Sequence, residues 1–463
     1  MFGKKREKNP DRVGIGRFWA WGSREVSETC SVLMLGYFMF YCTDTLYLDP
    51  VILGILLAVS RVIDAITDVI AGYLVDRTKT RLGKGRPYEL CVIGTWISVI
   101  LMFSCPASWG DTPKYIWVLS MYLLATALFN TFLNAGETVY MVRAFKRGQI
   151  IRVQSFMGVI SSIAGFAFNI IAPQLIAAYA PAGGGWTRIA IMVGCPVAII
   201  GMMRFIFIKE TEDVDADSKS SEEIRLRDAV TILRKNKYIW IIVLFTLFTN
   251  FASNLGLQVY YFEVILGNVG LQSVASALTI FALPFVFFFP KLLKKMQVHS
   301  LMALGAGMSI FGEIVCFFAN TNLIAFLIGN FFVMMGALPM SHIVRLMIFD
   351  CASYNEWKKM PRMEGTLAAI QGFAKRTGGA ISVAFGGILL GLIGYNAQME
   401  ITAGTMMGIR FGQTLLPGIF HLITFLILFF CYKLDDMMPQ INAENEAARE
   451  AAKAENESVS AEV

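Results

Sequence analysis

The sequence contains few charged residues, and those that it has are unevenly distributed. Of its 463 residues, 16% are Asp, Glu, Lys or Arg, whereas soluble domains carry about 25% charged residues. Hydrophobic residues make up 56% of the chain, and the mean hydropathy is +0.58. The polar residues lie between long apolar blocks. This pattern excludes an ordinary soluble domain and indicates a membrane protein with many spans.

Several signatures of other protein classes are also missing. The three histidines are scattered, and the eight cysteines show no CxxC or metal-ligand spacing, so we expect buried hydrophobic side chains rather than disulfides or a metal centre. There is no nucleotide-binding loop and no nucleophile–base arrangement, so neither an enzyme nor a cofactor is expected. Basic patches interleaved with exposed aromatic residues are absent, which argues against nucleic acid as a partner. No cleavable signal peptide is expected, because the basic start runs into a full-length apolar block.

Apolar blocks of spanning length recur twelve times along the chain. Only helices suit such blocks, because backbone groups in lipid must be satisfied within the segment. The predicted fold class is therefore an all-α membrane protein. The blocks cover residues 26–47, 50–76, 90–108, 115–142, 153–181, 187–208, 238–265, 271–291, 298–319, 322–350, 364–394 and 410–432.

A polar stretch at 209–237 separates six blocks from six. Its Ser220–Glu223 segment reads as a capping box that opens a short amphipathic helix. The predicted organisation is a first six-helix bundle, a cytoplasmic linker, a second six-helix bundle and a polar cytoplasmic tail, at 1–208, 209–237, 238–434 and 435–463.

Basic residues concentrate in alternate loops and predict the orientation. The intervening loops offer little beyond Lys114, Arg188 and Arg410. The positive-inside rule then places both termini in the cytoplasm of a protein of the cytoplasmic (inner) membrane, with the lipid bilayer as its surroundings. We expect a monomer. The basic residues assigned to the cytoplasmic side are Lys4, Lys5, Arg6, Lys8, Arg12, Arg17, Arg24, Arg77, Lys79, Arg81, Lys84, Arg86, Arg143, Lys146, Arg147, Arg152, Lys291, Lys294, Lys295, Lys358, Lys359 and Arg362.

Three charged residues lie inside the second apolar block. Arg61, Asp64 and Asp68 occur in RVIDAITDVIAGYLVD at spacings of three and four, which place them on one helical face. A charge at mid-membrane costs roughly 2.5–3.5 kcal/mol on insertion scales, so these side chains must face a polar interior. Two acids placed together can hold a cation or a proton in transit. The sequence therefore suggests an ion-coupled transporter, with an ion pair to Arg61 as the simpler structural alternative.

The segment that contains these acids resembles a known family. The stretch DAITDVIAGYLVDRTKTRLGKGRPY, residues 64–88, resembles the melibiose-permease-like glycoside–pentoside–hexuronide cation symporters of the major facilitator superfamily. The resemblance implies twelve helices in two six-helix bundles that expose a central site alternately. Further stretches agree, namely Tyr354-Asn-Glu-Trp-Lys-Lys, Arg362-Met-Glu-Gly365, Gln371 to Arg376-Thr-Gly-Gly and Leu390-Gly-Leu-Ile-Gly-Tyr395.

The resemblance also implies a cation site. Its members would be Asp64, Thr67 and Asp68 on the second helix and Thr131 on the fourth. Carboxylate and hydroxyl oxygens are hard ligands that suit sodium, with Asp64 and Asp68 as the metal ligands in that case. Either carboxylate could instead carry a proton, so the coupling ion stays open.

A sugar site between the two halves is implied as well. The family's acidic sugar ligand on the first helix corresponds to Glu28. Its second acidic ligand corresponds to Asn134, an amide that donates and accepts but carries no charge. The basic residue of the eleventh helix aligns with Arg376, with Lys375 beside it, and which of the two faces the cavity stays open. The further substrate-binding candidates are Arg61, Gln371, Tyr37, Tyr41 and His342.

The predicted function is import of a glycoside, pentoside or hexuronide together with sodium or a proton. A carrier of anionic sugars, in which Arg376 or Lys375 binds the carboxylate, is one alternative. A lysophospholipid-type lipid carrier of the same fold is another, and it predicts an apolar cavity open to the membrane. A membrane sensor that does not transport is the third, although it would need no acidic pair.

Overall fold

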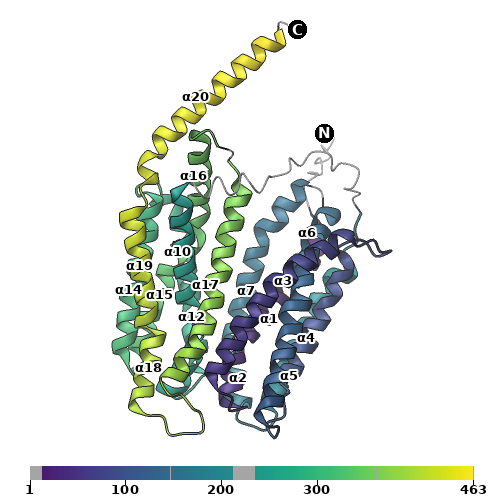
Figure 1. Ribbon diagram of the computed structural model, residues 1–463, viewed down its shortest axis with the longest axis vertical. Helices are drawn as coiled ribbons and strands as arrows, with labels where there is room; N and C mark the ends of the chain where they lie inside the picture. The colour runs from purple at the N-terminus through teal and green to yellow at the C-terminus, as the bar shows by residue number, and fades with distance from the viewer. Residues whose placement is uncertain (1–12, 146, 212–234, 361, 462–463) are drawn as a thin grey trace, which may run out of the picture. The chain divides into compact units, whose positions relative to one another are not determined.

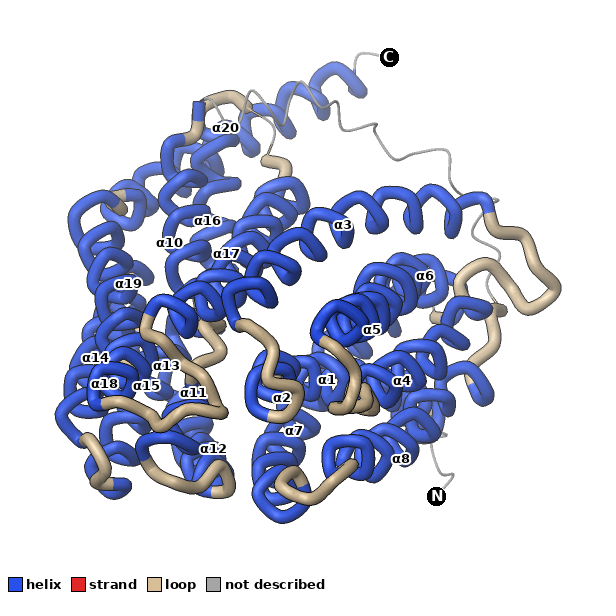
Figure 2. The backbone as a smooth tube through the Cα atoms, turned by 60° about the horizontal axis from the view of Figure 1, so that its bottom comes forward, coloured by secondary structure: helices blue, strands red, loops and turns tan. Residues whose placement is uncertain are grey.

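The computed structural model describes residues 13–145, 147–211, 235–360 and 362–461 (Figures 1 and 2). Within these ranges the secondary structure is helical, and no strand is present apart from an isolated bridge between Thr80 and Gly83. The chain packs as two units. The first comprises Met1–Ser221, Phe262–Ala277 and Gly387–Thr405, and the second comprises Glu222–Tyr261, Leu278–Gly386 and Met406–Val463.

The first part of the chain supplies eight α-helices, with a 3-10 turn at Arg86–Leu90 and a π-helical turn at Leu124–Asn130. These helices are α1 (Ile15–Leu35), α2 (Phe38–Asp44), α3 (Pro50–Arg77), α4 (Cys91–Met102), α5 (Asp111–Leu123), α6 (Thr131–Ala144), α7 (Arg147–Tyr179) and α8 (Gly185–Phe207).

The later part of the chain contains further helices, several of which are continued by short 3-10 or π-helical turns. They are α10 (Lys237–Ser253), α11 (Gln258–Tyr260), α12 (Leu271–Ala282), α13 (Phe289–Leu292), α14 (Val298–Ala319), α15 (Leu323–His342), α16 (Val344–Trp357), α17 (Glu364–Leu392), α18 (Ala403–Gln413), α19 (Leu415–Leu426) and α20 (Leu434–Ala461).

Eight segments in the described part of the chain are helical, apolar and long enough to cross a bilayer. The remaining predicted blocks correspond to shorter or interrupted helices, or to α17, so the count of twelve spans stays a prediction. The first block begins earlier than predicted, since α1 starts at Ile15 and is separated from α2 by Gly36 and Tyr37. The amphipathic linker helix falls largely on 212–234, outside the described residues.

Local sequence explains the start of α3. Asp49 is its N-cap, and the Asp49 carboxylate accepts hydrogen bonds from the backbone N–H groups of Val51 and Ile52 at 2.8 and 3.1 Å. Pro50 occupies the first helical position, where the missing N–H costs nothing. This cap fixes the end of the helix that carries Asp64 and Asp68.

The loop between α3 and α4 is held against the end of α8. The Glu210 carboxylate accepts hydrogen bonds from the backbone N–H groups of Lys84, Gly85 and Arg86 at 2.8–2.9 Å. The Arg86 guanidinium in turn donates to the Phe205 carbonyl oxygen. Successive backbone N–H groups that converge on an anion form a nest, so this basic loop has a defined conformation.

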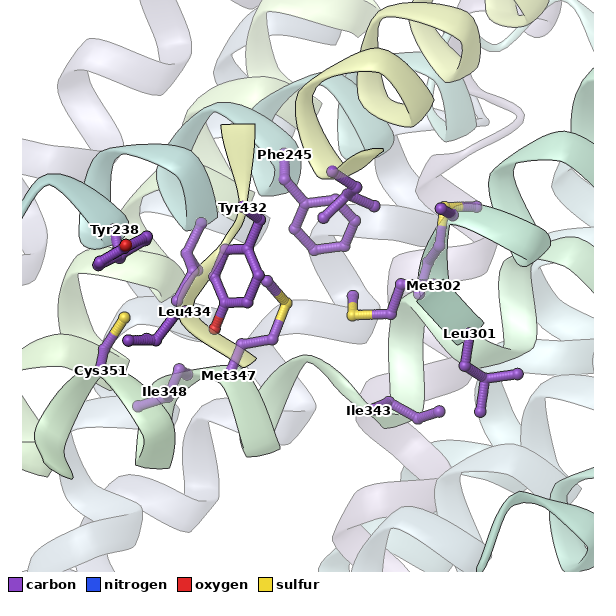
Figure 3. Close-up of a cluster of buried hydrophobic side chains, with 14 of the residues drawn as sticks. Tyr238, Phe245, Leu301, Met302, Ile343, Met347, Ile348, Cys351, Tyr432 and Leu434 are labelled. Atoms are coloured by element: carbon purple, nitrogen blue, oxygen red, sulfur yellow. The ribbon is translucent and has the colours of Figure 1, made fainter. Parts of the chain in front are cut away.

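The core of the second unit is a continuous cluster of apolar and aromatic side chains (Figure 3). Tyr238 and Phe245 of α10 pack there with Met302 of α14 and Met347 of α16, all at most 3% exposed. Leu434, at the start of α20, lies in the same cluster. The polar tail predicted from residue 435 therefore begins as a packed helix.

Charged residues also attach α20 to the loop after α16. The Glu356 carboxylate accepts hydrogen bonds from Arg362 at 2.8 Å and from Arg449 at 2.5–2.6 Å. The contact with Glu356 raises the pKa of Arg449, and contacts with Glu364 and then Glu356 raise the pKa of Arg362, since each guanidinium gains acidic partners. The tail helix and the loop thus share one carboxylate.

Glycines allow α14 and α15 to approach closely. An added Cβ at Gly305 would lie 2.6 Å from the Gly336 carbonyl oxygen, and one at Gly329 would lie 2.6 Å from the Gly312 carbonyl oxygen. Small residues at helix–helix contacts are the usual means of close packing in membranes. In the second unit, backbone contact between these helices therefore depends on the absence of side chains.

We predict that Gly305→Ala lowers the thermal unfolding midpoint of the purified protein. The added methyl group would meet backbone atoms of α15, and such overpacking costs about 1–3 kcal/mol. Gly307→Ala is the matched control, because a Cβ at this position of the same helix meets nothing within 4 Å. Equal midpoints for the two variants would contradict the close-packing account.

Candidate functional site

The structure brings three of the four predicted cation-site residues together. Thr131, at the start of α6, donates a hydrogen bond to Asp68 at 3.1 Å. Thr126, in the π-helical turn before α6, donates to Asp64 at 3.2 Å. Each acid of α3 therefore faces a threonine from the neighbouring helical stretch. These carboxylate and hydroxyl oxygens are the hard donors that suit sodium, and the carboxylates can equally accept a proton.

Thr67 lies on α3 between the two acids, and its hydroxyl bonds within the helix. Its hydroxyl donates to the carbonyl oxygens of Ile63 and Asp64, 3.1 and 2.9 Å away in its own helix. Such back-bonding satisfies the hydroxyl hydrogen within α3. Sequence reasoning missed Thr126, whose hydroxyl contacts Asp64.

Arg61 contacts one of the two acids. Its guanidinium lies 3.4 Å from Asp64, and its side chain is 42% exposed. At this distance and exposure the pair is loose. Arg61 therefore places one positive charge beside Asp64.

The predicted sugar ligands of the first and fourth helices are joined by a buried arginine. Arg24 of α1 donates to the Glu28 carboxylate at 2.5 Å and to the Asn134 side-chain oxygen at 3.0 Å. It also donates to the Leu133 carbonyl oxygen at 3.0 Å. Arg24, counted among the loop charges, is fully buried in the helical unit, so its assignment to a loop was wrong.

A second buried arginine extends this group of charges. Arg204, in the last turn of α8, lies 2.9 Å from Glu137 and 3.5 Å from Glu25. Glu137 also lies 3.1 Å from Arg24, so its carboxylate bridges the two guanidinium groups. Glu89, from the turn before α4, is 3.6 Å from Arg204 and 3.8 Å from Arg24.

These side chains differ in their access to solvent. The side chains of Arg24, Arg204 and Glu89 are at most 2% exposed, whereas Glu28 is 25% exposed and Glu137 22%. A small pocket adjoins the open side, beside Glu28 and Arg24, with hydroxyl groups and the Trp96 ring on its wall. Its lining includes Arg24, Ser27, Glu28, Ser31, Trp96 and Asn130.

The two tyrosines predicted to stack on a sugar are buried. Tyr41 is 2% exposed; its ring centroid lies 5.0 Å from that of Phe103 and 5.4 Å from that of Trp186, and its hydroxyl donates to the Cys105 carbonyl oxygen. Tyr37 is 5% exposed. In this structure the contacts of Tyr41 are those of a packing residue.

The remaining predicted substrate residues belong to the second unit. Gln371, Lys375 and Arg376 lie on α17, and the last two are exposed. His342 ends α15, where its Nδ1 lies 3.0 Å from the Leu338 carbonyl oxygen.

A buried pair between α14 and α19 was also missed. His421 Nδ1 lies 2.8 Å from the Glu313 carboxylate, and both residues are 4% exposed. The pair is not apparent from the sequence, because 108 positions separate the two residues.

Comparison with known proteins identifies the family. The family described as "MFS/sugar transport protein" matches residues 28–436. The chain belongs to this family. The predicted glycoside–pentoside–hexuronide symporter type and the major facilitator fold are thereby confirmed. The protein is a multi-pass membrane protein for sugar transport and not an enzyme.

Relatives with curated names agree with this assignment. The isoprimeverose transporter of Lactiplantibacillus pentosus is 26% identical, over 92% of this chain and 90% of the relative. The glucuronide carrier protein homolog of Escherichia coli (strain K12) is also 26% identical, over 86% of this chain and 88% of the relative.

Solved structures support the fold alone, because their sequence identity is low. A bacterial homolog of the lysosomal transporter Spinster has a TM-score of 0.69 at 12% identity, covering 95% of this chain and 99% of that one. A D-xylose–proton symporter has a TM-score of 0.58 at 14% identity, covering 88% and 97%.

We predict that Thr126→Val weakens binding of the coupling cation more than Thr67→Val does. The first change removes an oxygen donor that lies 3.2 Å from Asp64, and a neutral polar contact of this kind is worth about 0.5–1.5 kcal/mol. The second removes a hydroxyl that bonds to two carbonyl oxygens of α3. The Thr126 hydroxyl also lies 3.0 Å from a carbonyl oxygen of its own stretch, that of Tyr122, but it reaches an acid as well. Sodium titrations of the unfolding midpoint, repeated at several pH values, measure the difference. A larger loss for Thr67→Val would restore the cation site that the resemblance implies.

Proposed function

We propose that the protein imports a glycoside, pentoside or hexuronide together with sodium or a proton. The observation that carries this proposal is the pair of acids on α3, each hydrogen-bonded to a threonine of the adjacent helical stretch. Carboxylate and hydroxyl oxygens from two adjacent helical stretches supply the hard ligands that such a cation requires. Asp64, Asp68 and Thr131 are its proposed members, with Thr126 in place of Thr67.

The proposed substrate site uses Glu28 and Asn134. An ionised carboxylate accepts hydrogen bonds from sugar hydroxyls, and an amide both donates and accepts. The hydroxyl groups of Ser27 and Ser31 lie beside Glu28 in the lining of the small adjoining pocket. Gln371, Lys375 and Arg376 of α17 are the proposed contributors from the second half of the chain. This polar set disfavours a lysophospholipid carrier, which would need an apolar cavity.

Coupling follows from linkage between the two sites. A cation bound at Asp64 and Asp68 neutralises negative charge within the same helical unit that holds Glu28. If that favours sugar binding, then sugar must favour cation binding by the same factor. Alternating exposure of a midplane site is how transporters of this fold convert the linkage into uphill import. We propose a monomer in the cytoplasmic membrane with both termini in the cytoplasm.

Asp64→Asn or Asp68→Asn should abolish uphill accumulation of substrate. An amide can neither balance a cation nor carry a proton, whereas sugar exchange without a gradient requires neither and should survive. Uptake and counterflow of radiolabelled isoprimeverose and a glucuronide in proteoliposomes distinguish the two activities.

Asp49→Asn is the control on the same helix, because Asn caps a helix as well as Asp. Normal accumulation by both variants would refute the cation site, and absence of counterflow in the wild type for a panel of glycosides would favour a sensor.

A sugar acid is a second candidate substrate. Asn134 removes one acid from the family pattern, and Lys375 and Arg376 add positive charge on α17. The named relatives include a glucuronide carrier protein homolog. Arg is suited to bidentate binding of a carboxylate, in a way that Lys is not.

We expect Arg376→Gln to weaken binding of a glucuronide while leaving the matching glucoside unchanged. Loss of one charge-assisted contact corresponds to about 1.5–3 kcal/mol, or roughly tenfold or more in affinity. Isothermal titration of both ligands against the wild type, Arg376→Gln and Lys375→Gln measures the selectivity. Equal loss for the two ligands, or equal wild-type affinity, would show that these bases do not read substrate charge.

A further inference from the structure

The buried group of charges in the first unit contains more acids than bases. We call it the buried charge cluster; its members are Arg24, Glu25, Glu28, Glu89, Glu137 and Arg204. Two guanidinium groups face four carboxyl groups, so full ionisation would give the cluster a net charge of −2. Uncompensated charge inside a membrane helical unit is costly, and the cluster therefore needs further positive charge.

Two of its acids are too close for both to be ionised without cost. The side chains of Glu25 and Glu137 lie in hydrogen-bonding contact. The carboxyl oxygens of Glu25, Glu28 and Glu137 all lie within 4.8 Å of one another. A hydrogen bond between two carboxyl groups requires a proton on one of them, as in other carboxyl pairs that share a proton.

An independent observation comes from the closed side of the cluster. Glu89 is 2% exposed, and its Oε2 atom has no hydrogen-bond partner among the described residues. Its other oxygen lies 3.6 and 3.8 Å from the two arginines that also bind Glu137. A buried acceptor without a donor is expensive, and the Arg24 Nε atom likewise has no hydrogen-bond partner among the described residues. The hydrogen bonding of the cluster is therefore incomplete on this side.

The chemistry favours a proton over a metal ion. Each of Glu25, Glu28 and Glu137 already lies 2.5–3.5 Å from a guanidinium group. A metal ion between these oxygens would sit beside two fixed positive charges. A proton adds its charge within one carboxyl group and occupies no further space.

We propose that Glu25 and Glu137 share a proton and form a proton-binding site separate from the Asp64 and Asp68 pair. The proton can exchange with solvent, because the Glu25 side chain is 19% and the Glu137 side chain 22% exposed. The charged groups around it come from α1, the turn before α4, α6 and α8. From α7, Ile160 contributes an apolar side chain near Gly22.

The site connects to substrate through Arg24, and this step rests on the proposed function. Arg24 is shared among Glu137, Glu28 and Asn134. A proton on the Glu25–Glu137 pair weakens the attraction of Glu137 for Arg24. The Arg24 guanidinium then interacts more strongly with Glu28. Substrate that competes for Glu28 would then sense the protonation state of the pair.

Infrared spectroscopy of the full-length protein in lipid nanodiscs tests the shared proton without any sugar. We expect a protonated-carboxyl band at neutral pH that Glu25→Gln and Glu137→Gln each remove. The Asp64→Asn/Asp68→Asn double variant should retain it. Glu313→Gln controls for the buried acid beside His421. Since Gln can donate the hydrogen bond of a protonated Glu, we expect Glu25→Gln to fold, as size-exclusion chromatography would show.

The outcomes separate this proposal from the symport proposal. A band that persists in both Glu25→Gln and Glu137→Gln, or that disappears in the Asp64→Asn/Asp68→Asn variant, overturns the proton site even if sugar transport is normal. A band with the expected behaviour supports the site even if no sugar is accumulated. In the double Asp variant, binding of isoprimeverose or a glucuronide should depend on pH, and adding Glu25→Gln should abolish that dependence. Retained pH dependence overturns the link through Arg24.

Discussion

The first unit depends on the requirement that two buried guanidinium groups have partners. Arg24 and Arg204 are fully buried, and neither can lose its charge at accessible pH. Their acids come from α1, the turn before α4 and α6, so these elements must converge for the unit to be stable. Arg204 also donates to the Trp21 carbonyl oxygen at 2.8 Å and lies over the Trp21 ring at 4.1 Å. The arginines thus fix the helices on which the polar residues stand.

Helix α6 connects the two acidic sites physically. Thr131 contacts Asp68, Asn134 contacts Arg24 and Glu137 contacts both arginines. Their spacing of three residues places all three on one side of α6. A small rotation or shift of this helix would alter both sets of contacts together. Ion binding and sugar binding would then depend on each other through α6, without contact between the ion and the sugar.

Local sequence predicted the acidic pair on α3, because its periodicity and its cost in lipid are local properties. The resemblance implied Thr131 and Thr67 as members of the cation site; the Thr131 hydroxyl contacts Asp68, and the Thr67 hydroxyl bonds to carbonyl oxygens of its own helix. The contacts of Arg24 with α6 and of Arg204 with α1 join residues far apart in sequence, and at block ends such arginines look like loop charges. The spacing of Arg24, Glu25 and Glu28 in one helix could have signalled the network. The predicted helix boundaries were wrong where polar residues belong to the packed helix, as at the start of α1.

Two glycines near the end of α17 have a consequence for dissecting the protein. A Cβ at Gly387 would lie 2.7 Å from the Pro50 carbonyl oxygen, and Gly391 faces Val51, so this end of α17 packs directly on the beginning of α3. Tyr395 then donates a hydrogen bond to Asp44 at 2.6 Å. The first unit is thus completed by a late part of the chain. A fragment ending at Ser221 would expose these surfaces, and co-expressed half-length chains would have to assemble during folding rather than after it.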